Sequence, residues 1–423
     1  MAGSAQVALL LARLRDQLSP AALSALETIE RACAEDGLRL FLVCGTLRDL
    51  VLERTPLDID LAIEGDAVAL AQRIGQQVGA RVVVHQRFGT AKLSSRDFQF
   101  DLARTRRETY PHPGSLPRVE PATLIQDLSR RDFAINAFAL QLVPAEGEII
   151  DPFRGIDDIR SGLIRVLHER SFQDDATRML RGVRYATRFG FKLQRDTEAL
   201  LRRDLPYLGR ISGPRLRRDL ALLFAETNAV DGVRLAQRLG ILEAIHPALG
   251  LRDHVAGRWA EALSGQHEAP LNETGFCVVA DPHDEGTAAS VTKWLHLTGR
   301  VERALHDLVR LREQSAKLAD AKASPVVTVE LLERYAAAAV WAFSILDGGP
   351  AGEICREYLA TWRHAWPQLS GDDLLALGVA PGVAVGEMLK QLRTARLQGN
   401  GMTREQETGL VREALRGGMK RAE

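Results

Sequence analysis

The sequence predicts an α/β (α+β) head followed by an all-helical remainder. Over about the first 150 residues, short apolar runs bounded by glycine and proline alternate with helical periodicity, which is typical of helices packed on a sheet. After about residue 160 strand patterns nearly vanish, and helical segments follow one another to residue 423. A chain of 423 residues is also too long for one ordinary domain, so more than one folding unit is expected.

The first elements of the head carry clear start and stop signals. A helix is expected over 19–37, where Ser19 is the N-cap, Pro20 takes the first helical position and Gly37 ends the helix. The segments expected after it are a strand over 38–45, a short helix and turn over 47–56, a strand over 57–63, a helix over 64–79 capped by Asp66, and strands over 80–89, 90–95 and 97–103.

The second half reads as helices broken by glycine and proline. Those with the clearest periodicity span residues 174–191, 196–208, 213–227 and 229–245. Loops are expected near 264–290 and 319–327.

Composition excludes several classes of protein. Four scattered cysteines form no C-x-x-C pair, which argues against a disulfide framework and a structural zinc site. No stretch approaches the ~18 apolar residues of a membrane span, and the N-terminal run VALLLA lacks the features of a signal peptide. We therefore expect a cytoplasmic protein with no membrane partner.

The net charge of zero hides a local excess of positive charge. Between Arg178 and Arg218 there are twelve Lys or Arg and three Asp or Glu residues. Such a basic block suits a phosphate-rich partner. Solvated arginines on the faces of a helical bundle would give the same pattern.

Two aspartates stand two residues apart in an apolar run. Successive side chains of a strand alternate between faces, so Asp58 and Asp60 are expected to point the same way. Charged groups are rarely buried unless they are paired or bind a metal, and Mg²⁺ prefers one or two carboxylates plus waters and phosphates. Asp101, on another strand-like segment, is a candidate third ligand. A solvent-facing edge strand is the alternative.

A glycine loop precedes the carboxylates. The segment CGTLRD follows a buried strand and opens a helix, so Gly45 allows close backbone approach and the helix start attracts phosphate. Arg48 adds a planar, bidentate phosphate donor. A phosphate cradle beside a metal pair indicates nucleotidyl transfer with in-line attack.

These residues carry a resemblance to a known family. The stretch LVCGTLRDLVLERTPLDIDLAIEGDA resembles the first motif of the class II tRNA nucleotidyltransferases and bacterial poly(A) polymerases, G-G-x-V-R-D followed by D-x-D, with Cys44 in place of the first glycine. Asp174 and Pro214 stand where two later motifs have Glu. The further segments that resemble the family, in chain order, are DLARTRRETYPHPGSLPRVEP, DLSRRDFAINAFAL, IIDPFRGIDDIRSGLIRVL, FQDDATRMLRGVRYATRFGF, ISGPRLRRDLALLF and, more weakly, GDDLLALGVAPGVAVGEMLKQLRTARLQG.

The resemblance implies a domain order and an activity. It implies a DNA-polymerase-β-like head over 1–160, a helical neck with a nucleotide-selecting helix over 161–240, and a helical body and tail over 241–423 that bind tRNA. The activity would be template-independent addition of C and A to the tRNA 3′ end from CTP and ATP, with Mg²⁺ held by Asp58 and Asp60. An A-adding or CC-adding enzyme of a split system, a poly(A) polymerase, or a catalytically silent RNA-binding protein are the alternatives.

The nucleotide-selecting helix has a physical basis. Asp175 and Arg178, three residues apart, are expected on one helical face, where a carboxylate accepts hydrogen bonds and a guanidinium donates them. Together they complement the Watson–Crick edges of cytosine and adenine, whereas uracil and guanine would leave both contacts unmade. A surface ion pair is the alternative.

Other arginines are assigned by the resemblance. It implies that Arg181 and Arg184 help to hold the nucleotide, and that one of Arg130 and Arg131 contacts the triphosphate. Which of the two does so stays open.

A long proline- and arginine-rich segment lies within the head. RTRRETYPHPGSLPRVEP is long enough to be either functional or disordered. In the family this loop reshapes the site for the final A, and members that add only the two C residues tend to lack it. Its full length here favours an enzyme able to add A. The tail would follow the tRNA acceptor arm, or would serve in oligomerisation.

Overall fold

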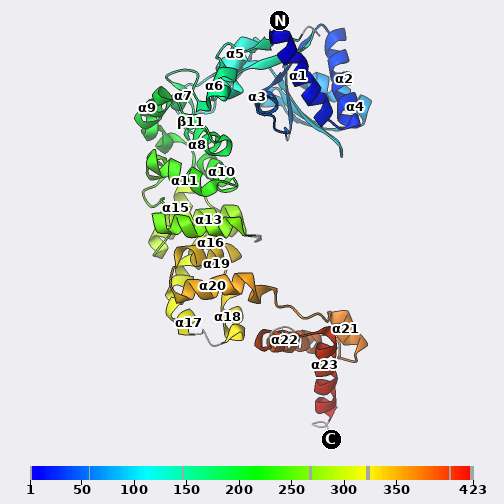
Figure 1. The fold of residues 1–423 in the computed structure, drawn as a ribbon, viewed down its shortest axis with the longest axis vertical. Coiled ribbons are helices and arrows are strands. Elements are labelled where there is room, and N and C mark those ends of the chain that lie inside the picture. Colours follow the sequence, from blue (N-terminus) through cyan, green and yellow to red (C-terminus); the bar gives the residue numbers. More distant parts are fainter. Residues whose placement is uncertain are drawn as a thin grey trace. The chain divides into compact units, whose positions relative to one another are not determined.

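The computed structural model describes residues 2–56, 58–144, 147–265, 269–320, 324–399 and 402–419. Figure 1 shows the ribbon of the chain, and its contacts divide it into two compact units. The first comprises residues 1–215 and 238–244, and the second comprises residues 216–237 and 245–423. The sequence-based domain boundaries at residues 160 and 240 stay predictions.

A mixed sheet forms the centre of the first unit, as the sequence predicts. Within the described residues it has seven strands in the order β3-β4-β5-β2-β1-β8-β9, and β2 and β5 are its parallel neighbours. The strands are β1 (Arg39–Val43), β2 (Ile59–Glu64), β3 (Arg81–His85), β4 (Thr90–Ser94), β5 (Gln99–Arg104), β8 (Ala139–Val143) and β9 (Ile149–Ile150).

The helices of the head lie on the two faces of this sheet. Ser19 caps α2 and Asp66 caps α4 through their side-chain oxygens, which confirms both predicted caps. On the opposite face Ala62 and Phe41 pack against Leu124 and Leu128 of α5. The bounds are α1 (Ala2–Gln17), α2 (Pro20–Glu35), α3 (Cys44–Val51), α4 (Ala67–Val78) and α5 (Leu124–Ser129), with the short 3-10 helices η1 (Gln86–Phe88) and η2 (Ala134–Asn136).

The long segment after β5 contains a hairpin. Strands β6 (Arg106–Thr109) and β7 (Arg118–Pro121) pair antiparallel, and residues 110–117 connect them. The predicted loop is therefore partly ordered as a two-stranded ribbon beside α5.

Short helices complete the first unit and continue into the second. The predicted helix over 174–191 is wrong at its start, because Asp175 is extended, with φ −146° and ψ 101°, and separates α7 from α8. The bounds are α6 (Gly155–Ser161), β10 (Leu163–Ile164), α7 (Ser171–Asp174), α8 (Arg178–Phe189), β11 (Lys192–Leu193), α9 (Arg195–Asp204), η3 (Leu205–Arg210), α10 (Gly213–Phe224), α11 (Ala229–Arg238) and α12 (Ile241–Ile245).

The second unit is helical within the described residues. Its core is built around α19, which is apolar on all sides and packs against α14, α16 and α20. The bounds are α13 (Asp253–Ser264), α14 (Leu271–Ala280), α15 (Glu285–Leu295), α16 (Arg300–Glu313), α17 (Ser315–Asp320), α18 (Pro325–Leu332), α19 (Ala337–Leu346), α20 (Pro350–Ala360), η5 (Trp362–His364), α21 (Gly371–Ala376), α22 (Val383–Gln398) and α23 (Arg404–Met419).

One predicted loop is wrong. The range 264–290 was expected to be a loop, but it contains the buried helix α14 and the start of α15. A helix buried on all sides has no amphipathic period, so its sequence gives no helical signal. Of the two predicted loops, residues 266–268 and 321–323 lie outside the described residues.

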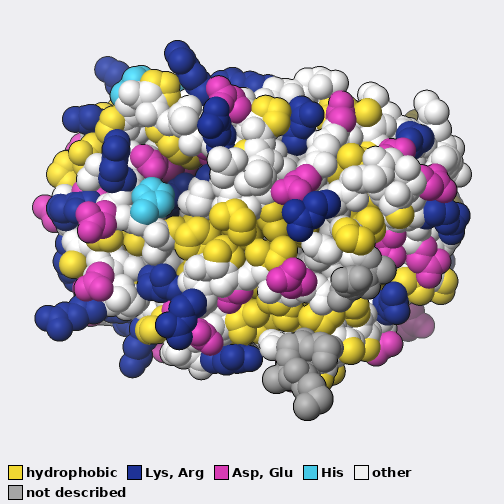
Figure 2. All heavy atoms as spheres, turned by 90° about the horizontal axis from the view of Figure 1, so that it is seen from above, with side chains coloured by type: hydrophobic (Ala, Val, Ile, Leu, Met, Phe, Trp, Pro, Cys, Tyr) yellow, Lys and Arg dark blue, Asp and Glu magenta, His cyan; other side chains and the backbone are white. Residues whose placement is uncertain are grey.

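The surface carries charges of both signs, in line with the net charge of zero. Figure 2 shows Lys and Arg side chains mixed with Asp and Glu around a central hydrophobic area on the face drawn. Of the helices in the described ranges, none combines the length and the apolar character that crossing a membrane requires.

A glycine brings α8 close to the head. A Cβ atom at Gly182 would lie 2.9 Å from Cζ of Phe133, and the Phe133 ring is fully buried and meets Tyr185 edge to face at 5.9 Å. Helix α8 can therefore approach η2 only because residue 182 has no side chain.

We expect Gly182→Val to lower the free energy of unfolding by about 1–3 kcal/mol, because the added atoms overpack this contact. Urea unfolding followed by circular dichroism measures the change. Gly209→Val is the matched control, since a Cβ atom at Gly209 would meet nothing within 4 Å. Equal stability of the two variants would contradict the close approach.

Candidate active site

The turn between β1 and α3 lies directly beside a catalytic carboxylate candidate. A Cβ atom at Gly45 would lie 3.5 Å from Asp60 Oδ2, so the glycine leaves the carboxylate accessible from this turn. Thr46 holds the turn in place, because its hydroxyl donates to the Asp58 carbonyl at 2.9 Å and accepts from the Asp60 N–H at 2.7 Å. Cys44 adopts a left-handed φ of 56°, a backbone conformation that the glycine of the family motif would adopt at lower cost.

Asp58, Asp60 and Asp101 lie on neighbouring strands or next to them. Strand β2 begins at Ile59, so Asp58 lies just before the strand, where it accepts from Gln99 Nε2 at 2.6 Å. Asp60 and Asp101 are direct register partners on the parallel strands β2 and β5. The sheet thus brings the predicted third carboxylate beside Asp60.

This grouping shifts the pKa values of two carboxyls. The pKa of Asp60 is raised to about 6, chiefly by burial; the charges of Asp101 and Asp58 act in the same direction, and Arg131 opposes them. Burial also raises the pKa of Asp101, while Lys92, 3.5 Å away, partly offsets this effect. Ionisation of Asp60 in the folded protein therefore costs free energy, and a nearby positive charge would reduce that cost.

The arrangement suits Mg²⁺ held by two carboxylates. Within the described residues, no group of three His, Cys, Asp or Glu side chains is placed to hold a metal ion by itself. Mg²⁺ does not require such a cage, because it usually takes one or two carboxylates and completes its octahedron with waters and substrate phosphates. That Asp58 and Asp60 hold the ion together stays a prediction, because Asp58 is not among the residues that border the cavities around Asp60. The raised pKa of Asp60 is the sign of unneutralised charge that a cation would remove.

The two arginines of the second motif share one buried partner. Asp127 Oδ2 accepts from Arg131 Nη2 at 2.7 Å, and its Oδ1 accepts from Arg130 Nη2 at 2.7 Å. Burial opposes ionisation of Asp127, but Arg131 and Arg130 outweigh it and hold the pKa of this carboxyl below its ordinary value. Arg131 also donates to Cys44 Sγ, whereas Arg130 also pairs with Glu108 at 2.9 Å. Both side chains border the same cavity, so the choice between them as triphosphate contact stays open.

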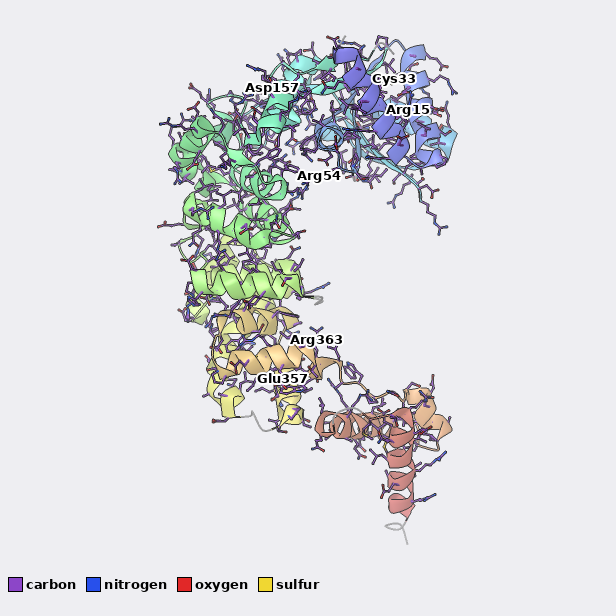
Figure 3. All side chains as sticks on the ribbon, in the orientation of Figure 1. Arg15, Cys33, Arg54, Asp157, Glu357 and Arg363 are labelled. Carbon is purple, nitrogen blue, oxygen red and sulfur yellow. The ribbon has the colours of Figure 1, made fainter. Side chains whose placement is uncertain are left out.

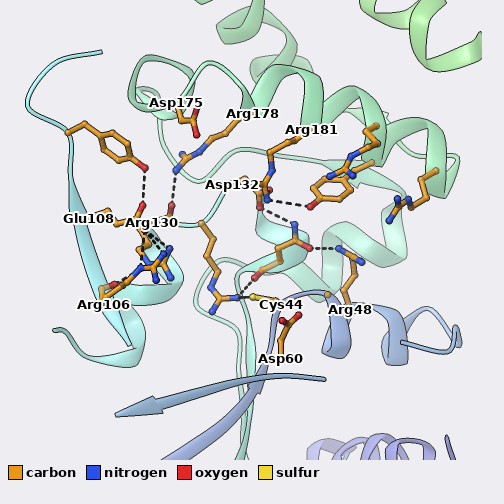
Figure 4. Close-up of a pocket in the computed structure, with 17 residues that line it drawn as sticks. Cys44, Arg48, Asp60, Arg106, Glu108, Arg130, Asp132, Asp175, Arg178 and Arg181 are labelled. Carbon is orange, nitrogen blue, oxygen red and sulfur yellow. Dashed lines mark hydrogen bonds and ion pairs between the residues drawn. The ribbon is translucent and has the colours of Figure 1, made fainter. Parts of the chain in front are cut away.

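Asp175 and Arg178 lie at the start of α8 and not on one helical face as predicted. Asp175 precedes the helix, and its Oδ1 accepts from the N–H of Thr177 at 3.0 Å, which is a typical cap of a first turn. Arg178, the first residue of the helix, donates to the carbonyls of Ser171 and Arg130. Each side chain is therefore held by its own partners, and both border the cavity (Figure 4).

Two further arginines of α8 make different contacts, Arg181 with the head and Arg184 within the helix. Arg181 Nη2 lies 2.6 Å from Oδ2 of the buried Asp132. Arg184 lies over the ring of Tyr185, with Cζ 5.5 Å from the ring centroid. Both border the cavity, as predicted for nucleotide-binding residues, and their roles toward a nucleotide stay predictions.

Arg48 was predicted to bind phosphate, and it also makes several contacts within the protein. It is buried, and it donates to Asp49 at 2.9 Å and to Asn136 at 2.7 Å. Its guanidinium Cζ lies 4.7 Å from the Phe189 ring centroid, and Arg54, labelled in Figure 3, lies 5.1 Å from the same centroid. Arg48 therefore joins α3 to α8 as well as bordering the cavity.

These groups surround a cavity of about 490 Å³ (Figure 4). Its volume is within the range of small-ligand sites. The predicted site residues that border it are Gly45, Arg48, Asp60, Arg130, Arg131, Asp175, Arg178, Arg181 and Arg184.

A second cavity of about 370 Å³ lies next to the first. Asp60 borders both cavities, but Asp101 and Lys92 border only the second, and Asp175 and Arg178 border only the first. The Asp60 carboxylate is thus accessible from two separate spaces.

Sequence reasoning missed several residues of the site. Asn136 and Asp132 were read only as parts of a motif, and Tyr110, Glu108 and Lys92 were not considered. A signal existed for Lys92, because β4 follows the same alternation as its neighbours and places it opposite Asp101. The others are brought in by tertiary packing.

The sequence is similar to known protein families and to individual proteins over most of its length. Residues 40–165 match the family model of the poly(A) polymerase head domain, and residues 190–251 match that of a probable RNA and SrmB-binding site of polymerase A. The A-adding tRNA nucleotidyltransferase of Halalkalibacterium halodurans is 30% identical over 385 residues, which cover 89% of each chain. The CC-adding tRNA nucleotidyltransferase of Deinococcus radiodurans is 31% identical over 406 residues, which cover 94% of this chain and 95% of that protein.

Solved structures give the same result for the fold. A CCA-adding enzyme in an apo form has a TM-score of 0.73 and 27% identity, covering 95% of this chain and 98% of that chain. A CCA-adding enzyme in complex with ATP has a TM-score of 0.71 and 25% identity, with coverages of 95% and 98%. The mixed head and helical remainder are therefore the fold of these enzymes.

We expect Asp60→Asn to stabilise the metal-free protein at neutral pH. Because the pKa of Asp60 rises from 3.8 to about 6 on folding, the folded state penalises the ionised carboxylate. This penalty grows as the pH rises from about 4 to about 6 and is constant above that range. At about 1.4 kcal/mol per pKa unit, the expected gain is about 1–3 kcal/mol at pH 8 and about half of that at pH 5.

Urea unfolding of both proteins in EDTA at the two pH values measures this gain. A variant that is less stable than the wild type at pH 8, or a gain that does not depend on pH, would contradict the charge repulsion at Asp60.

Proposed function

Since the chain belongs to the class II tRNA nucleotidyltransferase and bacterial poly(A) polymerase family, we propose that it adds the terminal A to tRNAs that end in CC, with ATP as donor. It is a tRNA 3′-end nucleotidyltransferase, and the proposal concerns which nucleotides it adds. Addition of the whole CCA triplet was the first expectation from sequence. The relatives named above, which match nearly end to end, carry A-adding and CC-adding names, and this favours a split system.

One observation carries the proposal: a carboxylate suited to nucleotidyl transfer and a base-reading pair border a single cavity. Asp175 offers acceptor oxygens and Arg178 offers donors, which complement the amino group and N1 of adenine. Guanine presents a carbonyl and an N–H at these places, so both contacts would be lost, at a cost of ~1–3 kcal/mol for each unpaired group. The protein could therefore choose ATP with no nucleic-acid template.

Cytosine also complements this pair, so the choice between A and C needs a further argument. The hairpin formed by β6 and β7 and the connecting residues 110–117 are present in full. By the family resemblance, a full-length loop accompanies the ability to add A. The loop residue Tyr110 borders the cavity beside Asp175 and Arg178, where it can affect the space left for a purine.

In the proposed reaction the triphosphate lies near the turn at Gly45, with the arginine-rich side of the cavity around it. When bound, Mg²⁺ at Asp58 and Asp60 would supply positive charge to the triphosphate and to the attacking hydroxyl. Arg130 or Arg131 orients the phosphates, and the α8 arginines hold the nucleotide.

We propose that the RNA 3′ end enters the second cavity. In-line attack on the α-phosphate requires that the hydroxyl approach opposite to the leaving pyrophosphate. Asp60 borders both cavities, so a nucleotide in the first and an RNA end in the second would meet at this carboxylate. Lys92 provides a positive charge in the second cavity for a terminal RNA phosphate.

Further contacts to tRNA are proposed for the basic block between Arg178 and Arg218. Phosphate contacts of this kind position RNA without reading its sequence. Recognition of the duplex arm would then rest on shape and backbone, as is usual for double-stranded RNA.

The direct test is incorporation of each labelled nucleotide into tRNA that ends at the discriminator base, at C or at CC. We expect A to be added to the CC-ended tRNA and no product with the other two. Complete CCA on all three would establish the full enzyme, C alone would establish a CC-adding enzyme, and long A tails would establish a poly(A) polymerase. Each of these results would overturn the A-adding assignment, as would the absence of any product.

Asp58→Ala and Asp60→Ala are expected to lower incorporation by at least about a thousandfold, because the charge stabilising the transferring phosphoryl group depends on them. Filter binding should show tRNA affinity within about twofold of the wild type, since neither side chain contacts the RNA backbone in the proposal. Asp36→Ala, which removes a carboxylate paired with Arg73 on the surface, is the control. Normal turnover by either site variant would refute the metal assignment.

A further inference from the structure

Arg215 joins two parts of the site that are far apart in the sequence. It lies near the start of α10, and its Nη2 donates to Asp175 Oδ1 at 2.8 Å. Its Nη1 donates to the carbonyl of Gly114, in the loop 110–117, at 3.3 Å. One guanidinium thus holds both a base-reading carboxylate and the loop.

The Asp175 carboxylate is oriented through a single oxygen. Besides Arg215, Oδ1 accepts the N–H of Thr177 at 3.0 Å and its hydroxyl at 2.7 Å. In the described part of the chain, all hydrogen bonds found for this carboxylate end on Oδ1. Oδ2 therefore remains as the acceptor for the amino group of a base.

The loop is docked through a residue that must be glycine. Gly114 has a left-handed φ of 81°, and a Cβ atom there would lie 2.9 Å from the carbonyl oxygen of Arg210. Both features exclude a side chain while the loop is docked. Tyr110, at the start of the same loop, donates to Glu108 and borders the cavity.

We propose that Arg215 is a positioning residue that couples the docked loop to base selection by fixing Asp175. This inference rests on the proposed nucleotidyltransferase activity and names the residue that sets its specificity. With the loop docked, the Gly114 carbonyl and Asp175 hold the guanidinium from two sides, so that Oδ2 is presented to the base. Without Arg215, only the two bonds from Thr177 hold the Asp175 carboxylate. It can then tilt toward Arg178, and an ion pair between them would remove both groups from base reading.

The first test measures equilibrium binding of ATP, GTP, CTP and UTP to the full chain without RNA. For Arg215→Ala we expect ATP affinity to fall about tenfold, the effect of one misplaced hydrogen bond to a charged group. Affinity for GTP should change less than about twofold, so the ATP/GTP ratio should fall nearly tenfold. Arg73→Ala is the control, since it removes a surface arginine–carboxylate pair outside both cavities and should leave the ratio unchanged.

Arg215→Lys serves as the conservative variant. A lysine keeps the positive charge near Asp175, but its single ammonium lacks the two-armed fork that spans both acceptors. We expect it to restore part of the ATP affinity lost in Arg215→Ala. It also provides the same test should Arg215→Ala fail to fold, as judged by circular dichroism.

The coupling itself is tested with Gly114→Val, because a side chain at residue 114 prevents the loop from docking. We expect the ratio of ATP affinity to GTP affinity to fall by the same factor in this variant as in Arg215→Ala. In the double variant the ratio should fall no further than in either single variant. Additive losses would overturn the coupling, and an unchanged ratio in folded Arg215→Ala would overturn the role of Arg215. Because binding is measured without RNA, a wild-type protein that discriminates ATP from GTP but fails to extend tRNA would refute the proposed function and not this inference.

Discussion

A chain of polar contacts, most of them buried, joins helix α8 to helix α3, and the shape of the cavity between them depends on it. Arg48 donates to Asn136 at 2.7 Å, Asn136 donates to Asp132 at 3.0 Å, and Asp132 pairs with Arg181 of α8 at 2.6 Å. Groups buried in this way are costly if one partner is lost, because the remaining charge has no water to replace it. The chain therefore allows few alternative positions of α8.

This rigidity explains how one cavity can serve both chemistry and base choice. In the proposed function, Asp175 and Arg178 must keep a fixed distance from the carboxylates near the triphosphate, and a difference of about 1 Å can cost a hundredfold in rate. Burial opposes ionisation of Asp132, but Arg181 and the hydrogen bond from Asn136 outweigh it and keep its pKa low. For Asp60 burial is not outweighed: together with the charges of Asp101 and Asp58 it raises the pKa, and Arg131 offsets only part of this effect. Within the cavity, Asp132 is thus compensated by its partners, whereas Asp60 keeps a charge that a bound cation would neutralise.

The sequence predicts the parts of this structure that are local. Caps such as Ser19 and Asp66 act within one turn of helix, and the alternation in the head strands follows from burial of one face, so both are readable. The carboxylates Asp60 and Asp101 could be proposed because strands place them predictably, whereas Asp58 was expected within the strand and lies just before it.

Other features depend on contacts between distant segments. The separation of Asp175 from α8 follows from Thr177 and Arg215, forty residues away in the second case, and no helical period reveals it. The engagement of Arg48 by Asn136 is equally non-local. Helix α14 was missed for a different reason, because a helix buried on all sides has no amphipathic pattern.

A structure of the full chain with Mg²⁺ and a non-hydrolysable ATP analogue tests the central claim most directly. The account predicts the triphosphate at Asp58 and Asp60, the adenine amino group on Asp175 Oδ2 and N1 facing Arg178. An adenine base outside the cavity bordered by Asp175 and Arg178, or one that contacts neither residue, would contradict it.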